Sequence, residues 1–107
     1  MRIQLFADST YLGDTQAKIV DASMGVIGGK LNPSAAYILQ FQYFFRRHLQ
    51  VPDWKELETL GLRAVGESGE SMEAQLGVCI EDLPGFEIEV AICGVRHKII
   101  DIISQNQ

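Results

Sequence analysis

The sequence predicts an α+β fold in which an antiparallel β-sheet of about four or five strands packs against one main amphipathic helix. Three observations support this prediction: a helical segment that begins after Asn32-Pro33, a change to a two-residue period beyond Leu62, and turn residues between the periodic segments. Helices and antiparallel strands that occur in separate runs are typical of this class. One or two short helices are expected besides the main one.

The first third of the chain carries strand and loop signals. Residues 2–6 place Ile3 and Leu5 on one side, which indicates a short strand. Residues 8–15 have the composition of a loop, and residues 17–22 favour a second strand. Several glycines lie within residues 24–31, which are therefore either a strand with a bulge or a loop.

The clearest element is the main helix, over residues 34–49. Asn32 is a good capping residue, and Pro33 suits the first helical position because an amide hydrogen there would have no partner. At 3.6 residues per turn, a mostly aromatic and aliphatic set of side chains shares an arc of about 140°. This set consists of Tyr37, Ile38, Phe41, Phe44, Phe45, His48 and Leu49. The arc is expected to cover the apolar face of the sheet.

The second half of the chain begins with a short helix and continues as strands. Asp53 and Glu56 fit a capping box, and Gly61 is well placed to follow the helix. Alternation over residues 72–80 and 86–92 then predicts strands. Together, residues 62–94 are expected to form a three-stranded C-terminal meander. Isoleucines at helical spacing around Asp101 favour a short helix at the end.

Length and composition restrict the class of protein. The chain has 107 residues, of which 47% are hydrophobic and 21% charged, as in an ordinary globular protein. We expect a single domain over residues 1–107. No apolar run approaches the ~18 residues of a membrane span. Asp8 interrupts the N-terminal segment too early for a good signal peptide, so a cytoplasmic protein is expected.

The charge of the chain is negative and unevenly distributed. The formal net charge of −5 argues against a nucleic-acid-binding protein, which usually shows a basic surface. Most of the acidic residues lie between Asp53 and Glu89, where Lys55 and Arg63 are the basic residues. The predicted meander is therefore the acidic part of the molecule.

The acidic residues of the meander are the first candidate binding site. Glu81 is expected directly opposite Glu89 across a Pro84-Gly85 hairpin, and Glu73 on the same outer face. Like charges opposed on a sheet are mildly destabilising unless a cation or a basic partner lies between them. Two interpretations remain open: a solvated face that keeps the protein soluble, or a negative face that docks a basic protein surface. The candidate partner-binding acids are Glu73, Glu81, Glu87 and Glu89.

A second candidate contact is the back of the main helix. Leu39 and Tyr43 lie four residues apart there, among polar side chains. Together they offer a contact for a homodimer, or for another layer of the fold. The edges of the sheet are another route to self-association.

His48 is the one candidate for catalysis, because it is a polar side chain within an apolar arc. It is either a core-edge histidine with a hydrogen-bond partner or a general base in a pocket under the helix. The second interpretation needs a carboxylate to orient the ring, such as Asp8 or Asp21.

The remaining motifs point to no cofactor. Gly28-Gly29-Lys30 lacks the preceding glycine and the following hydroxyl of a phosphate-binding loop. Cys79 and Cys93 are too few for a disulfide framework and too far apart in sequence for a zinc motif. We expect two reduced thiols in a sheet, with a single bridge as the alternative, and neither a metal nor a cofactor.

These observations leave two hypotheses. The first is a small non-enzymatic protein-interaction module of the inhibitor, immunity or adaptor type, with a basic protein partner and a homodimer as an option. The second is a small enzyme or ligand-binding protein with a pocket between helix and sheet around His48. The concentrated acidity and the lack of a complete catalytic motif favour the first.

Overall fold

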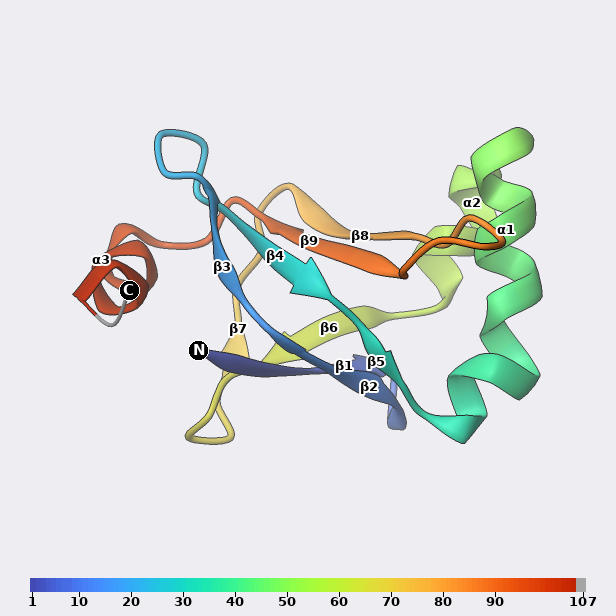
Figure 1. Cartoon of the computed structure of the whole chain (residues 1–107), viewed down its shortest axis with the longest axis horizontal. Helices are drawn as coiled ribbons and strands as arrows, with labels where there is room; N and C mark the ends of the chain where they lie inside the picture. The colour runs from blue at the N-terminus through green and yellow to red at the C-terminus, as the bar shows by residue number, and fades with distance from the viewer. Residues whose placement is uncertain (106–107) are drawn as a thin grey trace.

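The structure is a computed structural model that describes residues 1–105, and its core is a pair of antiparallel sheets with helices at both ends (Figure 1). The strands are β1 (Arg2–Ala7), β2 (Thr10–Gln16), β3 (Lys18–Asp21), β4 (Val26–Lys30), β5 (Asn32–Pro33), β6 (Leu62–Val65), β7 (Ser71–Met72), β8 (Gly77–Glu81) and β9 (Glu89–Cys93). The helical segments are a π-helical turn (Tyr37–Phe41), α1 (Gln42–Gln50), α2 (Trp54–Thr59) and α3 (His97–Gln105). The predicted α+β class is confirmed.

Two bent strands join the sheets, whose orders are β5-β2-β1-β6-β7 and β3-β4-β9-β8. β2 runs into β3 through Ala17, and β4 runs into β5 through Leu31. The ladders continue across these bends, because the amide of Ala17 donates to the carbonyl of Met1 and that of Leu31 donates to the carbonyl of Ile88, both at 2.8 Å. The two sheets therefore enclose one common core.

The core follows from the alternation of side chains along the strands. Side chains on one side of each strand point between the sheets, and those on the other side point outward. The five-stranded sheet contributes Ile3, Leu5, Leu12 and Ala64, and the four-stranded sheet contributes Ile27, Ile80, Val90 and Ile92, all of them buried. Each sheet consequently has one apolar inner face.

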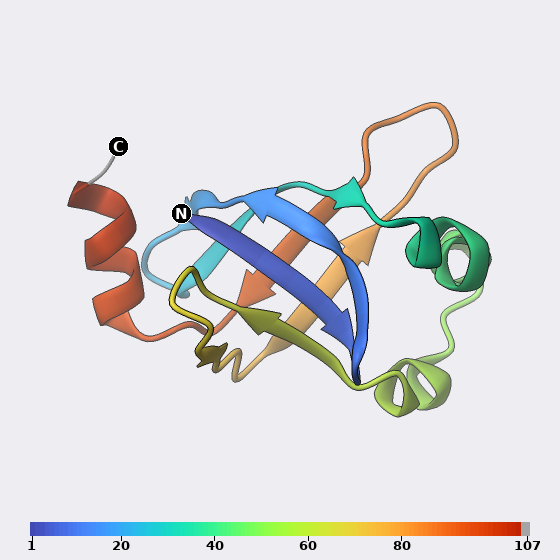
Figure 2. The ribbon, with the colours of Figure 1, turned by 90° about the horizontal axis from the view of Figure 1, so that it is seen from below.

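The main helix closes one end of this two-layer core, and α3 lies at the opposite end (Figures 1 and 2). The π-helical turn contacts β2 of one sheet, while α1 contacts β8 of the other. Tyr37, Phe44 and Phe45 are buried there, with the rings of Tyr37 and Phe45 stacked at 5.9 Å. The expectation that the helix covers the face of one sheet is therefore wrong.

The π-helical turn also changes which side chains of the helix are buried. Ile38, which the arc includes, is 44% exposed, and Leu49 is exposed as well. The arc assumes 3.6 residues per turn throughout, whereas a π-helical turn is wider and shifts the phase of the residues after it. The apolar face is therefore shorter than the sequence predicts.

The predicted three-stranded meander is also wrong. β7 pairs with β6 in the first sheet, whereas β8 pairs with β9 in the second. A turn before Gly77, whose φ is +96°, separates the two halves of the alternating segment. Alternation reports which side chains are buried but not which strand is the neighbour, so it continues through a change of sheet.

The predicted loop over residues 8–15 is wrong because most of it is β2. Asp14 faces outward and accepts hydrogen bonds from Arg2 and Asn32. These bonds lower the pKa of Asp14 and link β1, β2 and β5. The predicted short helix is confirmed as α2, where Asp53 accepts from the amide of Glu56 at 3.1 Å. The C-terminal helix is confirmed as α3.

One fully buried carboxylate ties the main helix to the four-stranded sheet. Asp82 directly follows β8 and has no exposed surface. It accepts hydrogen bonds from the Tyr37 hydroxyl at 2.8 Å, the Gln42 amide at 3.1 Å and the Arg46 guanidinium at 3.1 Å. Burial, with Asp82 beside the hydroxyl, raises the pKa of Tyr37. None of the described helices is long and apolar enough to cross a membrane.

Removing this carboxylate should destabilise the protein. We expect Asp82→Ala to lower the free energy of unfolding by about 3 kcal/mol, because three donors lose their acceptor and the charge of Arg46 loses its partner. Tyr37→Phe, which removes one bond, should cost about 1 kcal/mol. Urea unfolding measures both. Asp101→Ala, at an exposed position of α3, is the control, and equal stability of the two Asp→Ala variants would contradict this role.

Candidate functional site

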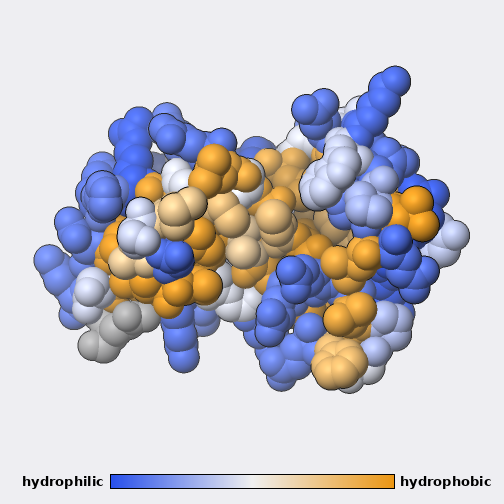
Figure 3. All heavy atoms as spheres, turned by 90° about the horizontal axis from the view of Figure 1, so that it is seen from above, coloured by the Kyte–Doolittle hydropathy of each residue, from blue (hydrophilic) through white to orange (hydrophobic). Residues whose placement is uncertain are grey.

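The outer face of the four-stranded sheet is an uncovered surface of the core (Figure 1). The inward side chains of its strands are buried, whereas Lys18, Val20, Lys30 and Cys79 are outward. Because the helices lie at the two ends of the molecule, none of them covers this face in the described part of the chain (Figures 1 and 2). Figure 3 looks onto the face and shows apolar side chains across its middle, with hydrophilic ones around them.

The strand registers fix how the outward residues are arranged. Lys30 pairs with Glu89, and Glu89 pairs with Glu81, which makes one row of charged residues across β4, β9 and β8. The neighbouring row runs from Lys18 on β3 through Gly28 and Ala91 to Cys79 on β8. The face therefore has a charged end and a middle built from small side chains.

The small side chains leave a hollow of about 400 Å³ in this face. Gly28 and Ala91 line its floor, and charged side chains stand around it. The charges are Lys18, Lys30, Glu81, Glu87 and Glu89. Charged side chains around a floor of small residues suit the docking of another surface, and the thiol of Cys79 also lines the hollow.

The charges are separated by sign across the sheet. The lysines lie on β3 and β4, and Glu81 and Glu89 lie on β8 and β9. Glu81 is directly opposite Glu89, as the sequence predicts. The connection between them spans residues 82–88 and is longer than the expected three-residue turn. Glu87, in this connection, forms an ion pair with Lys30 at 3.4 Å.

Glu73 does not share this face. It lies in the connection between β7 and β8 and forms an ion pair with Arg96, just before α3, at 2.9 Å. Together with Met72 and Ile99 it lines a separate hollow of about 430 Å³ beside α3. The expectation for Glu73 assumed an uninterrupted strand through residue 80, and the change of sheet removes that basis.

Leu39 and Tyr43 are exposed on the helical end, where they are 82% and 78% accessible. The guanidinium of Arg47 lies over the ring of Tyr43, 6.0 Å from its centre. Trp54 at the start of α2 and Phe86 in the 82–88 connection are also exposed. These four side chains are each exposed, and the expected dimer contact on this helix stays a prediction.

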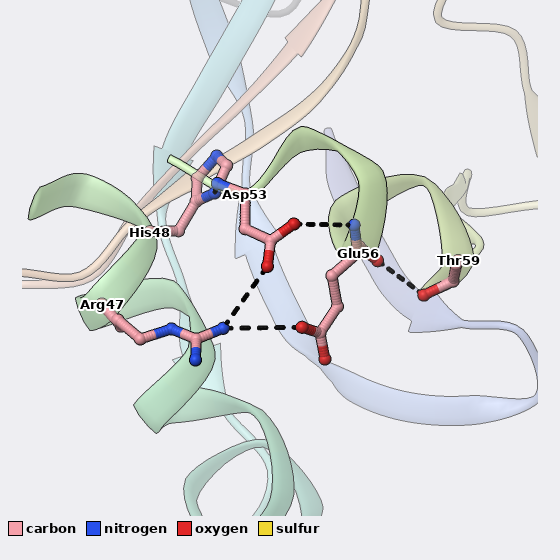
Figure 4. A network of polar contacts seen from close by, with 5 residues as sticks. All are labelled: Arg47, His48, Asp53, Glu56 and Thr59. Atoms are coloured by element: carbon pink, nitrogen blue, oxygen red, sulfur yellow. Dashed lines mark hydrogen bonds and ion pairs between the residues drawn. The ribbon is translucent and has the colours of Figure 1, made fainter. Parts of the chain in front are cut away.

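His48 holds the corner between α1 and α2 (Figure 4). Its Nδ1 accepts a hydrogen bond from the amide of Asp53 at 2.8 Å. The ring stacks on Phe44 at 5.4 Å and meets Trp54 edge-on at 4.8 Å. Arg47 completes the corner through ion pairs with Asp53 and Glu56, at 3.7 and 3.5 Å.

The two carboxylates considered as partners of His48 lie in other parts of the fold. Asp8 is in the turn after β1, where its amide donates to the carbonyl of Gly61. Asp21 ends β3 and accepts from Ser23 and Met24. Within residues 1–105 no hydrogen bond joins either one to His48. The structure therefore does not bring the proposed catalytic pair together.

The two cysteines are free thiols on neighbouring strands of the sheet. Cys79 pairs with Ala91 and Cys93 with Gly77, so the thiols are diagonal neighbours. Partial burial and the proximity of Cys79 raise the pKa of Cys93. Among the described residues no group of three or more His, Cys, Asp or Glu side chains is placed to hold a metal ion.

The outward lysines were missed by the sequence reasoning, although a signal for them exists. Lys18 and Lys30 alternate with the buried Ile27 and the half-buried Ile19, so their direction follows once residues 18–30 are taken as a hairpin. Their proximity to Glu81 and Glu89 does not follow, because it requires the pairing of β4 with β9.

No family model matches the sequence, and no similarity to a curated protein or to a solved structure was found. The functional interpretation accordingly rests on the geometry of the surface.

The role of His48 at the helix corner can be tested by substitution. We expect His48→Phe to lower the free energy of unfolding by about 1 kcal/mol, because the amide of Asp53 loses its acceptor. His48→Asn keeps an acceptor for this amide but loses the ring contacts with Phe44 and Trp54, so it should also be less stable than the unaltered chain. Thermal or urea unfolding measures both variants. If His48→Phe were as stable as the unaltered chain, the hydrogen bond would not stabilise this corner.

Proposed function

We propose that the protein is a non-enzymatic protein-interaction module whose docking surface is the outer face of the four-stranded sheet. The observation that carries the proposal is the direct opposition of Glu81 and Glu89 beside a hollow that none of the described helices covers. A protein partner with a basic surface would neutralise these carboxylates. The cost of opposing them, a few tenths of a kcal/mol, would then be offset on binding.

The composition of the face supports docking of a macromolecule. Small side chains in the middle allow close approach, and charges around them fix the orientation of a partner. A net charge of −5 favours the approach of a basic protein over long distances. Electrostatic complementarity of this kind raises the rate of encounter and selects the partner.

The alternative function, an enzyme or ligand-binding protein with a pocket around His48, has less support. Nδ1 of His48 is engaged by the backbone of Asp53, and the ring is held between Phe44 and Trp54. These contacts are those of a structural histidine. We also propose that the protein acts in the cytoplasm, which the two unbridged thiols support.

Neutralising the opposed pair should weaken capture of the partner without harming the fold. We expect Glu81→Gln/Glu89→Gln to reduce the amount of protein partner retained from the source lysate several-fold at low salt, and to unfold at the same or a higher urea concentration. The control is Glu58→Gln/Glu70→Gln, which changes two exposed acids away from this face. Quantitative mass spectrometry of the eluates measures the difference. Equal retention by both double variants would contradict the proposal.

A further inference from the structure

We propose that the partner of this sheet face is a second copy of the chain, packed face to face about a two-fold axis parallel to β4 and β9. This inference rests on the proposed function and identifies its partner. In each copy, the lysines on one side of the face then supply the basic surface that binds the glutamates of the other copy.

The charge pattern across the strands is complementary to itself. β4 and β9 are the two central strands of the sheet, so an axis between them exchanges its two sides. The exchange sets Lys30 of one copy against Glu89 of the other. Because the axis is two-fold, the same contact forms twice. Lys18 comes over β8 of the other copy, next to Glu81.

The pattern along the strands selects the direction of the axis. The charged row of Lys30, Glu89 and Glu81 lies at one end of the face, and Val20 and Cys93 lie toward the other end. An axis parallel to the strands sets the charged row of one copy on the charged row of the other, and sets the end that carries Val20, Cys93 and Asp21 on the same end of the other copy. An axis across the strands would bury the charged row against apolar side chains, which is costly.

The floor of the face permits this packing. Sheets that stack face to face are separated by about 10 Å when ordinary side chains lie between them. Gly28 and Ala91 occupy the centre of this face, so two copies can approach closely there. Their close approach would bring the charged side chains around both hollows within reach of one another.

The test is a charge swap between two variants of the full chain. Lys30→Glu alone and Glu89→Lys alone should each weaken the homodimer on the order of tenfold, because each places two like-charge contacts in the interface. Sedimentation equilibrium over a range of concentrations measures the dissociation constants. Lys55→Glu and Glu58→Lys, on the exposed side of α2, are matched controls that should dimerise as the unaltered chain does.

Mixing the two interface variants should restore association. In the mixed dimer, the acidic side chain at position 30 of one copy faces the basic side chain at position 89 of the other, and the second contact retains Lys30 against Glu89. We expect native mass spectrometry to show the heterodimer in excess over both homodimers. Circular dichroism checks that each variant is folded, since Lys30 and Glu89 are also neighbours within one chain.

A second measurement needs no variant. Cys79 lies on the face and is exposed in the single chain. Its alkylation by iodoacetamide should therefore be slower at a concentration where the dimer is populated than after dilution. Equal rates at both concentrations would overturn the proposed interface.

The other outcomes separate this inference from the proposed function. If the unaltered chain is monomeric but binds a basic protein, and Glu81→Gln/Glu89→Gln loses that protein, the homodimer is overturned. The proposed docking function is then supported. A dimer whose dissociation constant is unchanged by Lys30→Glu and by Glu89→Lys also overturns the inference, because the contact must then lie elsewhere, such as at the helical end. A monomer that retains no partner contradicts both proposals.

Discussion

The hydrogen bonds of Asp82 determine much of what surrounds the candidate surface. This one buried carboxylate joins the π-helical turn and α1 to the end of β8. An unpaired charge at that depth would cost several kcal/mol, so Tyr37, Gln42 and Arg46 must be in place when the core forms. The contact holds the helix across the end of the two sheets. It also fixes the start of the 82–88 connection, and hence the position of Glu81.

The location of the helices explains why a sheet face remains uncovered. In the expected arrangement, the main helix would cover one face of a single sheet. In the observed fold, the bent strands pair the two apolar faces with each other, so the helices are needed only at the ends (Figure 2). Uncovered outer faces are therefore a consequence of the closed two-sheet core. What distinguishes the four-stranded sheet is the pattern of charge on its outer face.

Local signals were sufficient for some elements and insufficient for others. The cap of α2 by Asp53, strand β1 and the opposition of Glu81 and Glu89 depend on residues close in sequence, and the sequence predicts them. β2 was hidden because its buried positions include Gly13 and Thr15 instead of apolar side chains, and because its register with β1 shifts along the strand. Asp82 has the sequence context of a surface acid between Glu81 and Leu83. Only the approach of Tyr37 and Arg46 makes it a buried one.

The glycines of the face are required by the fold, whereas the pattern of its charges is informative about function. A Cβ on Gly28 would collide with the carbonyl of Val90, and one on Gly29 would lie 2.7 Å from the hydroxyl of Thr15. The fold itself therefore requires both glycines, and the hollow is a result of that requirement. The core does not fix the signs of the charges around the hollow. Within one chain Lys30 pairs with Glu87 and Glu89, but the opposition of Glu81 and Glu89 has no such benefit, so this opposed pair is the feature that selection for a partner would explain.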